Sequence, residues 1–148
     1  MSNQSNIEDY LKENGTLTYT FRGTSMYPLL KQGRDLFTVA EKTPKRCKKN
    51  DVVLYRRSEH QYILHRVIAV RSNDYVIQGD NCMTKEYGIQ DEDIIGVMTS
   101  FKHNGKVYDV TDSRYLIYVR IWTAIHPFIS AFQRIGVRFS GRIRRCLR

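Results

Sequence analysis

Cysteine is scarce in this chain of 148 residues, and proline is equally rare. The three cysteines, Cys47, Cys82 and Cys146, are scattered, with no Cys-x-x-Cys pair and no histidine at a ligand spacing. This pattern argues against a disulfide framework or a metal cluster, and we expect reduced thiols in a reducing compartment. The sequence gives no reason to expect a metal or another cofactor.

Acidic residues are missing from residues 113–148, which hold eight of the 24 Lys and Arg residues of the chain. Residues 1–112 contain the other 16 and all 15 Asp and Glu, so this part is nearly neutral. Because the positive charge belongs to the tail, no nucleic-acid partner is expected. Residues 1–6 are polar and lack the charged-then-apolar order of a signal peptide.

Residues 1–112 predict one mainly β domain that begins with a short helix. Ile7, Tyr10 and Leu11 have helical spacing within residues 5–13, and Asn14-Gly15 should end this helix. Seven segments are rich in Val, Ile and Tyr or alternate between apolar and polar residues. These predicted strands are residues 16–22, 35–40, 51–56, 62–70, 75–78, 94–100 and 106–110. Asn104-Gly105 favours a hairpin, and residues 42–50 are expected to be a solvated loop.

Residues 113–148 predict a second segment, an amphipathic helix with an Arg-rich tail. The apolar residues recur at spacings of three and four. They are Ile117, Ile121, Ile125, Phe128, Phe132, Ile135 and Phe139. Asp112 or Ser113 can cap the helix, and Pro127 should kink it or split it in two.

A potential catalytic serine lies in the segment Gly23-Thr24-Ser25-Met26-Tyr27-Pro28. A serine becomes a nucleophile when a base removes its proton and the backbone keeps it exposed, and Gly and Pro suit the rigid turn that this requires. His65 lies forty residues later in an apolar run, where an imidazole can stay neutral and act as a base. The alternatives are a turn serine and a core histidine.

Four segments, in this order, resemble the signal peptidase/LexA-like serine peptidases. They are residues 23–30 with Gly33 and Asp35, residues 50–55, residues 63–68, and Gly79-Asp80-Asn81. The resemblance covers roughly residues 20–100 and implies a coiled β-sheet peptidase domain with an SH3-like barrel component. His65, where many relatives have lysine, resembles the histidine-type signal peptidases of the endoplasmic reticulum and archaea.

The resemblance implies that Ser25 attacks a peptide carbonyl and that His65 takes its proton. Asp80 matches the first acid of the family, and the expected second aspartate is replaced by Glu86. Either acid can orient His65, while Asp80 can equally close its turn and Glu86 can equally be a solvated surface residue.

The implied oxyanion hole involves the Ser25 N–H group. Gly23 stands where many relatives have a hydroxyl residue, and Thr24 can compensate. Met26 is expected to pack rather than to contact the substrate.

The function implied by the resemblance is a serine endopeptidase that cleaves leader or signal-type peptides. One alternative is a LexA-like self-cleaving regulator, which His65 and the lack of an Ala-Gly or Cys-Gly dipeptide disfavour. Another is a catalytically degenerate peptidase fold that binds peptides or membranes, which Gly23 and Glu86 at departing positions suggest.

The C-terminal segment allows three arrangements. Residues 115–132 approach the ~20 residues of a membrane span but contain Arg120, His126 and Pro127. The helix can pack on the β domain, lie in the membrane interface or, as the least favoured reading, cross the bilayer. The interfacial reading explains both the apolar row and the arginines, and it predicts a protein on the cytoplasmic side or at the membrane.

Overall fold

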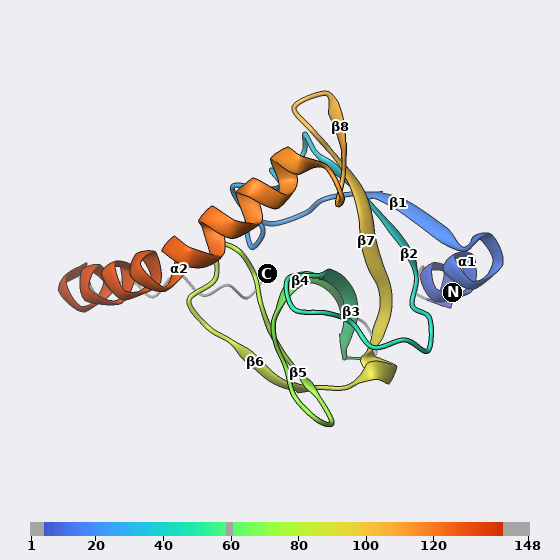
Figure 1. Cartoon of the computed structure of the whole chain (residues 1–148), viewed down its shortest axis with the longest axis horizontal. Coiled ribbons are helices and arrows are strands. Elements are labelled where there is room, and N and C mark those ends of the chain that lie inside the picture. Colours follow the sequence, from blue (N-terminus) through green and yellow to red (C-terminus); the bar gives the residue numbers. More distant parts are fainter. Residues whose placement is uncertain (1–4, 59–60, 141–148) are drawn as a thin grey trace.

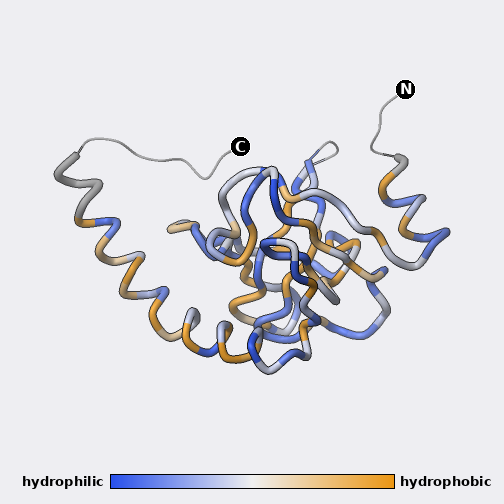
Figure 2. The backbone as a smooth tube through the Cα atoms, turned by 90° about the horizontal axis from the view of Figure 1, so that it is seen from above, coloured by the Kyte–Doolittle hydropathy of each residue, from blue (hydrophilic) through white to orange (hydrophobic). Residues whose placement is uncertain are grey.

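The computed structural model describes residues 5–58 and 61–140, with the side chains of residues 7–58 and 61–135. Two helices frame a set of strands, with α1 and the long α2 at opposite ends of the molecule (Figures 1 and 2). The elements are α1 (Ser5–Asn14), β1 (Thr16–Thr20), β2 (Leu36–Glu41), β3 (Val52–Ser58), β4 (Gln61–Val70), β5 (Tyr75–Gln78), β6 (Glu86–Ile89), η1 (Asp91–Asp93), β7 (Ile94–His103), β8 (Lys106–Asp109) and α2 (Ser113–Ser140).

The strands form one antiparallel sheet in the order β1-β2-β7-β3-β4-β5-β6, and β8 pairs with the end of β7. Five of the strand pairings shift register, and such bulges bend and twist a sheet. The mainly β prediction is confirmed. The implied barrel component is not seen as a closed barrel, because within the described residues no pairing joins the edge strands β1 and β6.

One strand, β6, was not predicted from the sequence. Gly88 in this strand has φ of +76°, and the side chain of Tyr87 is largely exposed, so the segment lacks the alternation typical of a half-buried strand. It pairs with β5, where Ile77 lies opposite Glu86. This pairing brings Glu86 back towards the centre of the sheet.

The two faces of β4 bury different clusters. Leu64 packs with Leu54 in a core that also includes the turn around Ser25 and the start of α2. Val67 packs with Val53 and Tyr55 in a second cluster. Because neighbouring residues of a strand point to opposite faces, His65 belongs to the second side and Arg66 to the first.

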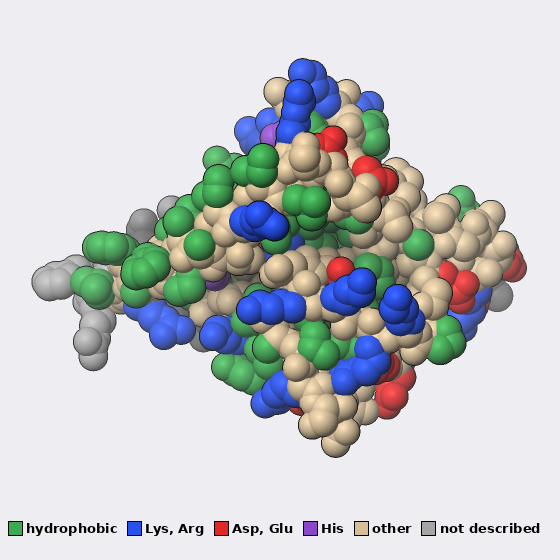
Figure 3. Space-filling view, viewed as in Figure 1, with side chains coloured by type: hydrophobic (Ala, Val, Ile, Leu, Met, Phe, Trp, Pro, Cys, Tyr) green, Lys and Arg blue, Asp and Glu red, His purple; other side chains and the backbone are tan. Residues whose placement is uncertain are grey.

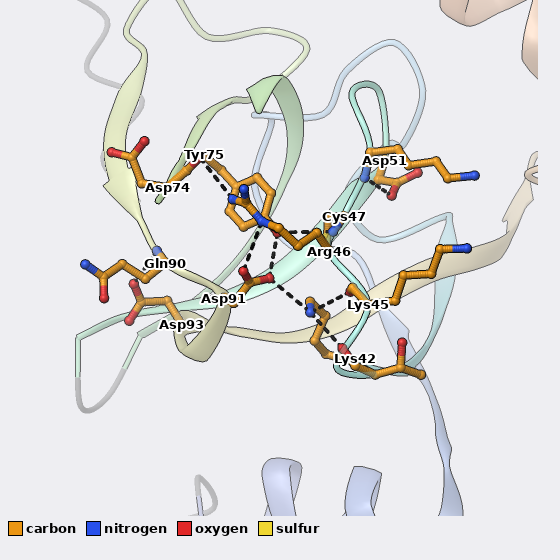
Figure 4. A network of polar contacts seen from close by, with 12 residues as sticks. Lys42, Lys45, Arg46, Cys47, Asp51, Asp74, Tyr75, Gln90, Asp91 and Asp93 are labelled. Carbon is orange, nitrogen blue, oxygen red and sulfur yellow. Dashed lines mark hydrogen bonds and ion pairs between the residues drawn. The ribbon is translucent and has the colours of Figure 1, made fainter. Parts of the chain in front are cut away.

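The loop of residues 42–50 is mostly exposed, as predicted, but Arg46 and the buried Cys47 anchor it to the domain. Asp91 joins it to β5, because its carboxylate accepts hydrogen bonds from Tyr75 Oη at 2.6 Å and Arg46 Nε at 3.2 Å. Lys42 Nζ lies 3.1 Å from the same carboxylate, as Figure 4 shows. Cys47 beside them is buried, and burial raises the pKa of its thiol to about 11. The contacts of Lys42 and Arg46 with Asp91 therefore fix the loop against the second cluster.

Helix α2 continues through Pro127 as one element, so of the two predicted effects of this proline, a kink or a split, the split does not occur. Tyr115 and Val119 are buried against the sheet, which confirms that part of the helix packs on the β domain. A second apolar row faces outward, and its side chains are between 41% and 75% exposed. The members of this outer row are Ile117, Ile121, Ile125, Phe128, Phe132 and Ile135.

None of the helices in the described ranges combines the length and the apolarity that a membrane crossing needs. Arg142, Arg144, Arg145 and Arg148 of the predicted tail lie outside the described residues.

Candidate functional site

Ser25 lies in a turn that joins β1 to β2. The turn is closed by the Tyr27 N–H, which donates to the Thr24 carbonyl at 3.1 Å, and by the Leu30 N–H, which donates to the Met26 carbonyl at 2.9 Å. Met26 and Leu30 are fully buried, and each such side chain contributes about 1.5–3 kcal/mol to folding. The buried side chains of Met26 and Leu30 therefore anchor the turn to the core, while Ser25 stays partly exposed.

The Gly79-Asp80-Asn81 turn docks directly on the serine turn. Asn81 donates from its backbone N–H to the Ser25 carbonyl at 2.8 Å and from its side chain to the Thr24 carbonyl at 3.1 Å. A Cβ atom on Gly79 would lie 2.6 Å from the Ser25 carbonyl oxygen and 2.9 Å from His65 Nε2. These distances are too short for any side chain, so glycine is required for the two turns and His65 to meet here.

His65 is almost completely buried in β4, with 3% of its surface exposed. Its Nε2 atom lies beside Gly79, which the Ser25 carbonyl also approaches, and its Nδ1 atom lies 3.3 Å from Glu86 Oε1. Tyr55 Oη lies 3.4 Å from the same Nδ1 atom. The ring is thus oriented with one nitrogen towards the serine turn and the other towards an acid.

Glu86 is held in place by Arg57, whose Nε donates to Oε2 at 2.9 Å and whose second nitrogen pairs with Oε1. Burial opposes the ionisation of Glu86, but hydrogen bonds from His65, Arg57 and Tyr55 outweigh it and lower its pKa to about 2. An ionised carboxylate can only accept, so it favours the tautomer with the proton on Nδ1 of His65. The unprotonated nitrogen of His65 is then Nε2, on the side of the serine turn.

Asp80 lies elsewhere, although it matches the family motif. Its carboxylate accepts two hydrogen bonds from Arg66, both at 2.8 Å, and one from Tyr118 Oη at 2.9 Å. Desolvation opposes the charge of Arg66, but the nearby Asp80 carboxylate outweighs it and raises the Arg66 pKa. The side chains of both partners are only 2% exposed. Asp80 is therefore a structural residue that joins β4 to α2, and it does not contact His65 in the described part of the chain.

The residues of the implied oxyanion hole differ in their hydrogen bonds and burial. The Ser25 N–H donates no hydrogen bond to any described residue, so it is available to an oxyanion. Gly23 has φ of +87°, and its N–H donates to Gln32 Oε1 at 2.8 Å. Thr24 is exposed and offers its carbonyl to Asn81, whereas Met26 is packed in the core as expected.

An open groove of about 890 Å³ begins at Ser25 and runs between α1, β1 and β4. Its lining is mostly apolar and aromatic, and includes Leu17, Phe21, Tyr62 and Ile63. A groove of this kind suits an extended peptide with apolar side chains.

No group of His, Cys, Asp and Glu in the described ranges is arranged to hold a metal ion. The side chains of the site can take part in proton transfer and nucleophilic attack.

Arg57 and Tyr55 were missed by the sequence analysis, although they hold Glu86 and His65. Arg57 lies near the end of β3, and only the pairing of β5 with β6 brings Glu86 near it. The sequence could have indicated that Arg66 and His65 have different partners. Since Arg66 follows His65 in a strand, it must point to the other face, and an acid paired with Arg66 cannot also orient His65.

The chain was also compared with known proteins. Neither the family models nor the curated sequences gave a match.

Proposed function

We propose that this protein is a serine endopeptidase in which Ser25 is the nucleophile, His65 the general base and Glu86 the residue that orients His65. The orientation of His65 carries the proposal, since Nε2 faces the serine turn while Nδ1 faces an ionised carboxylate. A core histidine needs no such pair of neighbours.

The proposed reaction begins when Ser25 Oγ attacks the carbonyl carbon of a peptide bond and His65 Nε2 takes the hydroxyl proton. The oxygen of the tetrahedral intermediate becomes negative and accepts a hydrogen bond from the Ser25 N–H. His65 then gives its proton to the leaving amine, and an acyl-enzyme remains. Water, deprotonated by His65, then attacks the ester carbonyl carbon. The bond to Ser25 Oγ breaks, His65 returns the proton to Oγ, and the acid product leaves. Glu86 stabilises the imidazolium in both steps.

The four ordered segments and the open antiparallel sheet support a peptidase domain of the signal peptidase/LexA-like class. The apolar groove beside Ser25 supports leader or signal-type peptides as substrates, with small residues before the scissile bond. The Gly79-Asp80-Asn81 turn also supports a peptidase, because the hydrogen bond from the Asn81 N–H to the Ser25 carbonyl holds the nucleophile in a fixed position.

A fluorophosphonate probe tests this function directly, because it forms a covalent bond with an activated serine. We expect the purified protein to be labelled on Ser25, and we expect Ser25→Ala and His65→Gln to abolish labelling. Ser72→Ala is the matched control, since Ser72 is an exposed serine in the turn after β4. Circular dichroism of each variant separates a lost nucleophile from a lost fold.

A folded protein that is never labelled and cleaves no leader peptide would favour the degenerate peptidase fold instead. Intact mass after prolonged incubation separates the self-cleaving regulator from both.

We also propose that the outer row of α2 lies on an anionic membrane surface. Figure 3 shows hydrophobic side chains gathered along α2 with Lys and Arg side chains beside them. Helix α2 contains no acidic residue, and Arg120 and Arg134 flank the outer row. An amphipathic helix with this composition is typical of membrane interfaces.

Flotation with phosphatidylglycerol vesicles tests the membrane contact. We expect the protein to float, and we expect Phe128→Glu with Phe132→Glu to abolish flotation. Tyr87→Glu is the control, because Tyr87 is an equally exposed aromatic residue on β6. Flotation that is equal for all three proteins would contradict this role of α2.

A further inference from the structure

A second pocket, of about 570 Å³, lies between α2 and the strands. Trp122, His126 and Pro127 of α2 form one wall, and Ile68 of β4 and Met83 form part of the other. Its volume is within the range of 300–1,000 Å³ that is usual for ligand sites. The mechanism proposed above does not use this pocket.

The rim of the pocket is cationic. Lys49, Lys85 and Arg134 line it, and none of them forms an ion pair with a described carboxylate. Asp80 is the sole acid among the lining residues, and Arg66 already neutralises it. Three cations without an ion pair, beside the apolar side chains of Ile68, Met83 and Trp122, suit a ligand that is both acidic and apolar.

The pocket also contains an unused hydrogen-bond acceptor. Asn50 lines it, and the carboxamide oxygen of Asn50 is buried without a partner among the described residues. Buried polar atoms nearly always have a partner, and this one is left unsatisfied beside the pocket. A hydrogen-bond donor is the kind of group that would satisfy it. A peptide N–H is such a donor, whereas an ionised phosphate offers acceptors only.

The pocket borders the candidate site. Gly79, which touches both His65 and the backbone of Ser25, also lines the pocket. Ser25 itself lines the apolar groove beside β1. Ser25 thus lies at the apolar groove, and Gly79, which separates the serine turn from His65, lies at the cationic pocket.

We propose that the pocket under α2 binds an acidic segment of the peptide substrate, on one side of the scissile bond, while the groove beside Ser25 binds an apolar segment on the other side. This inference rests on the proposed peptidase function. It identifies the substrate as a peptide whose apolar and acidic parts flank the bond to be cut. Lys49, Lys85 and Arg134 then determine specificity and take no part in proton transfer.

Trp122 makes binding measurable without catalysis, because it is the one tryptophan of the chain and lines the pocket. The probe is the peptide acetyl-Asp-Leu-Glu-Phe-amide, titrated into the full-length Ser25→Ala protein. We expect a saturable change in fluorescence that weakens as salt is added. The matched peptide acetyl-Lys-Leu-Lys-Phe-amide should give no saturable change.

Charge reversal connects the signal to the pocket. We expect Lys49→Glu with Lys85→Glu to weaken binding of the acidic peptide by about tenfold or more, because two attractions become repulsions. Lys106→Glu, on the exposed strand β8, should leave the affinity unchanged. Equal affinity for both peptides, or no effect of the double reversal, overturns the proposal. Phosphatidylglycerol vesicles that alter Trp122 fluorescence through Lys49 and Lys85, with no response to the acidic peptide, overturn it in favour of a lipid headgroup.

The two proposals can fail separately. Labelling of Ser25 by the fluorophosphonate probe reports the nucleophile and does not depend on the pocket. If Ser25 is labelled but the acidic peptide does not bind, the specificity proposal fails alone. If the peptide binds and Ser25 is never labelled, the peptidase proposal fails and the pocket belongs to a peptide-binding module.

Discussion

The two faces of β4 show how one strand can separate chemistry from structure. On one face, His65 meets Glu86, which is partly exposed and held by Arg57. On the other face, Arg66 meets Asp80, and this pair is closed off from water by Tyr118 of α2. Asp80 lies in the connection after β5, and Glu86 is the first residue of β6. Their roles differ because the strand sends neighbouring side chains in opposite directions.

The largest difference between the two faces should appear in stability. We expect Asp80→Asn to lower the free energy of unfolding by about 3–5 kcal/mol, because it leaves the buried charge of Arg66 without its partner. Urea denaturation measures this loss. Asp74→Asn is the control, since the pair that it breaks with Arg71 is exposed and should leave stability nearly unchanged. Equal losses in the two variants would mean that the Asp80 face is not the structural one.

The next difference should appear in activity. We expect Glu86→Gln to lower kcat/KM for a leader peptide by roughly 10²–10³-fold, because a neutral amide no longer stabilises the imidazolium or fixes its tautomer. The rate of labelling by the fluorophosphonate probe should fall in parallel. Glu92→Gln, an exposed change in η1, is the control. If Glu86→Gln keeps full activity, then Glu86 does not act on His65.

A smaller effect is the pH dependence of stability at Glu86. The pKa of Glu86 is lowered to about 2 in the folded protein from an ordinary value of 4.5. A lowered pKa stabilises the protein above the unfolded value, and this contribution is lost as the pH falls through the folded value. We expect the wild-type protein to exceed Glu86→Gln by about 2 kcal/mol at pH 6, and the gap to close between pH 4.5 and pH 2. A gap that stays constant over this range would contradict the ionised state of Glu86.

The two faces also differ in what the sequence could predict. Ser25, His65 and the Gly79-Asp80-Asn81 turn depend on local conformation, and short motifs specify local conformation. The role of Asp80 depends on Tyr118, which is 38 residues away in the chain, so no local motif contains it. Glu86 was placed by its distance from Asp80 in the family pattern. Strand β6, which carries it, has no alternation that a sequence could reveal.

Helix α2 also shows what a sequence pattern can and cannot predict. Helical periodicity predicted α2 correctly, because apolar spacing reports a helix whatever covers it. It could not divide the apolar residues into a packed face and an exposed face. That division follows from where the Asp80 turn lies, since Tyr118 and Trp122 both donate hydrogen bonds to Asp80. The outer row consists of the apolar residues of α2 that point away from the contact of Tyr118 and Trp122 with Asp80.

The smallest expected effect tests whether α2 is needed to hold Asp80. We expect Tyr118→Phe to lower the free energy of unfolding by about 1 kcal/mol, because one hydrogen bond to the carboxylate is lost while both bonds from Arg66 remain. Tyr108→Phe is the matched control, because Tyr108 is partly buried against Phe101 and its hydroxyl has no hydrogen bond within the described ranges. Labelling of Ser25 should be unchanged in both variants, since Asn81 still holds the serine turn. A loss of labelling in Tyr118→Phe alone would mean that α2 acts on the catalytic face through Asp80, and that the two faces of β4 are coupled.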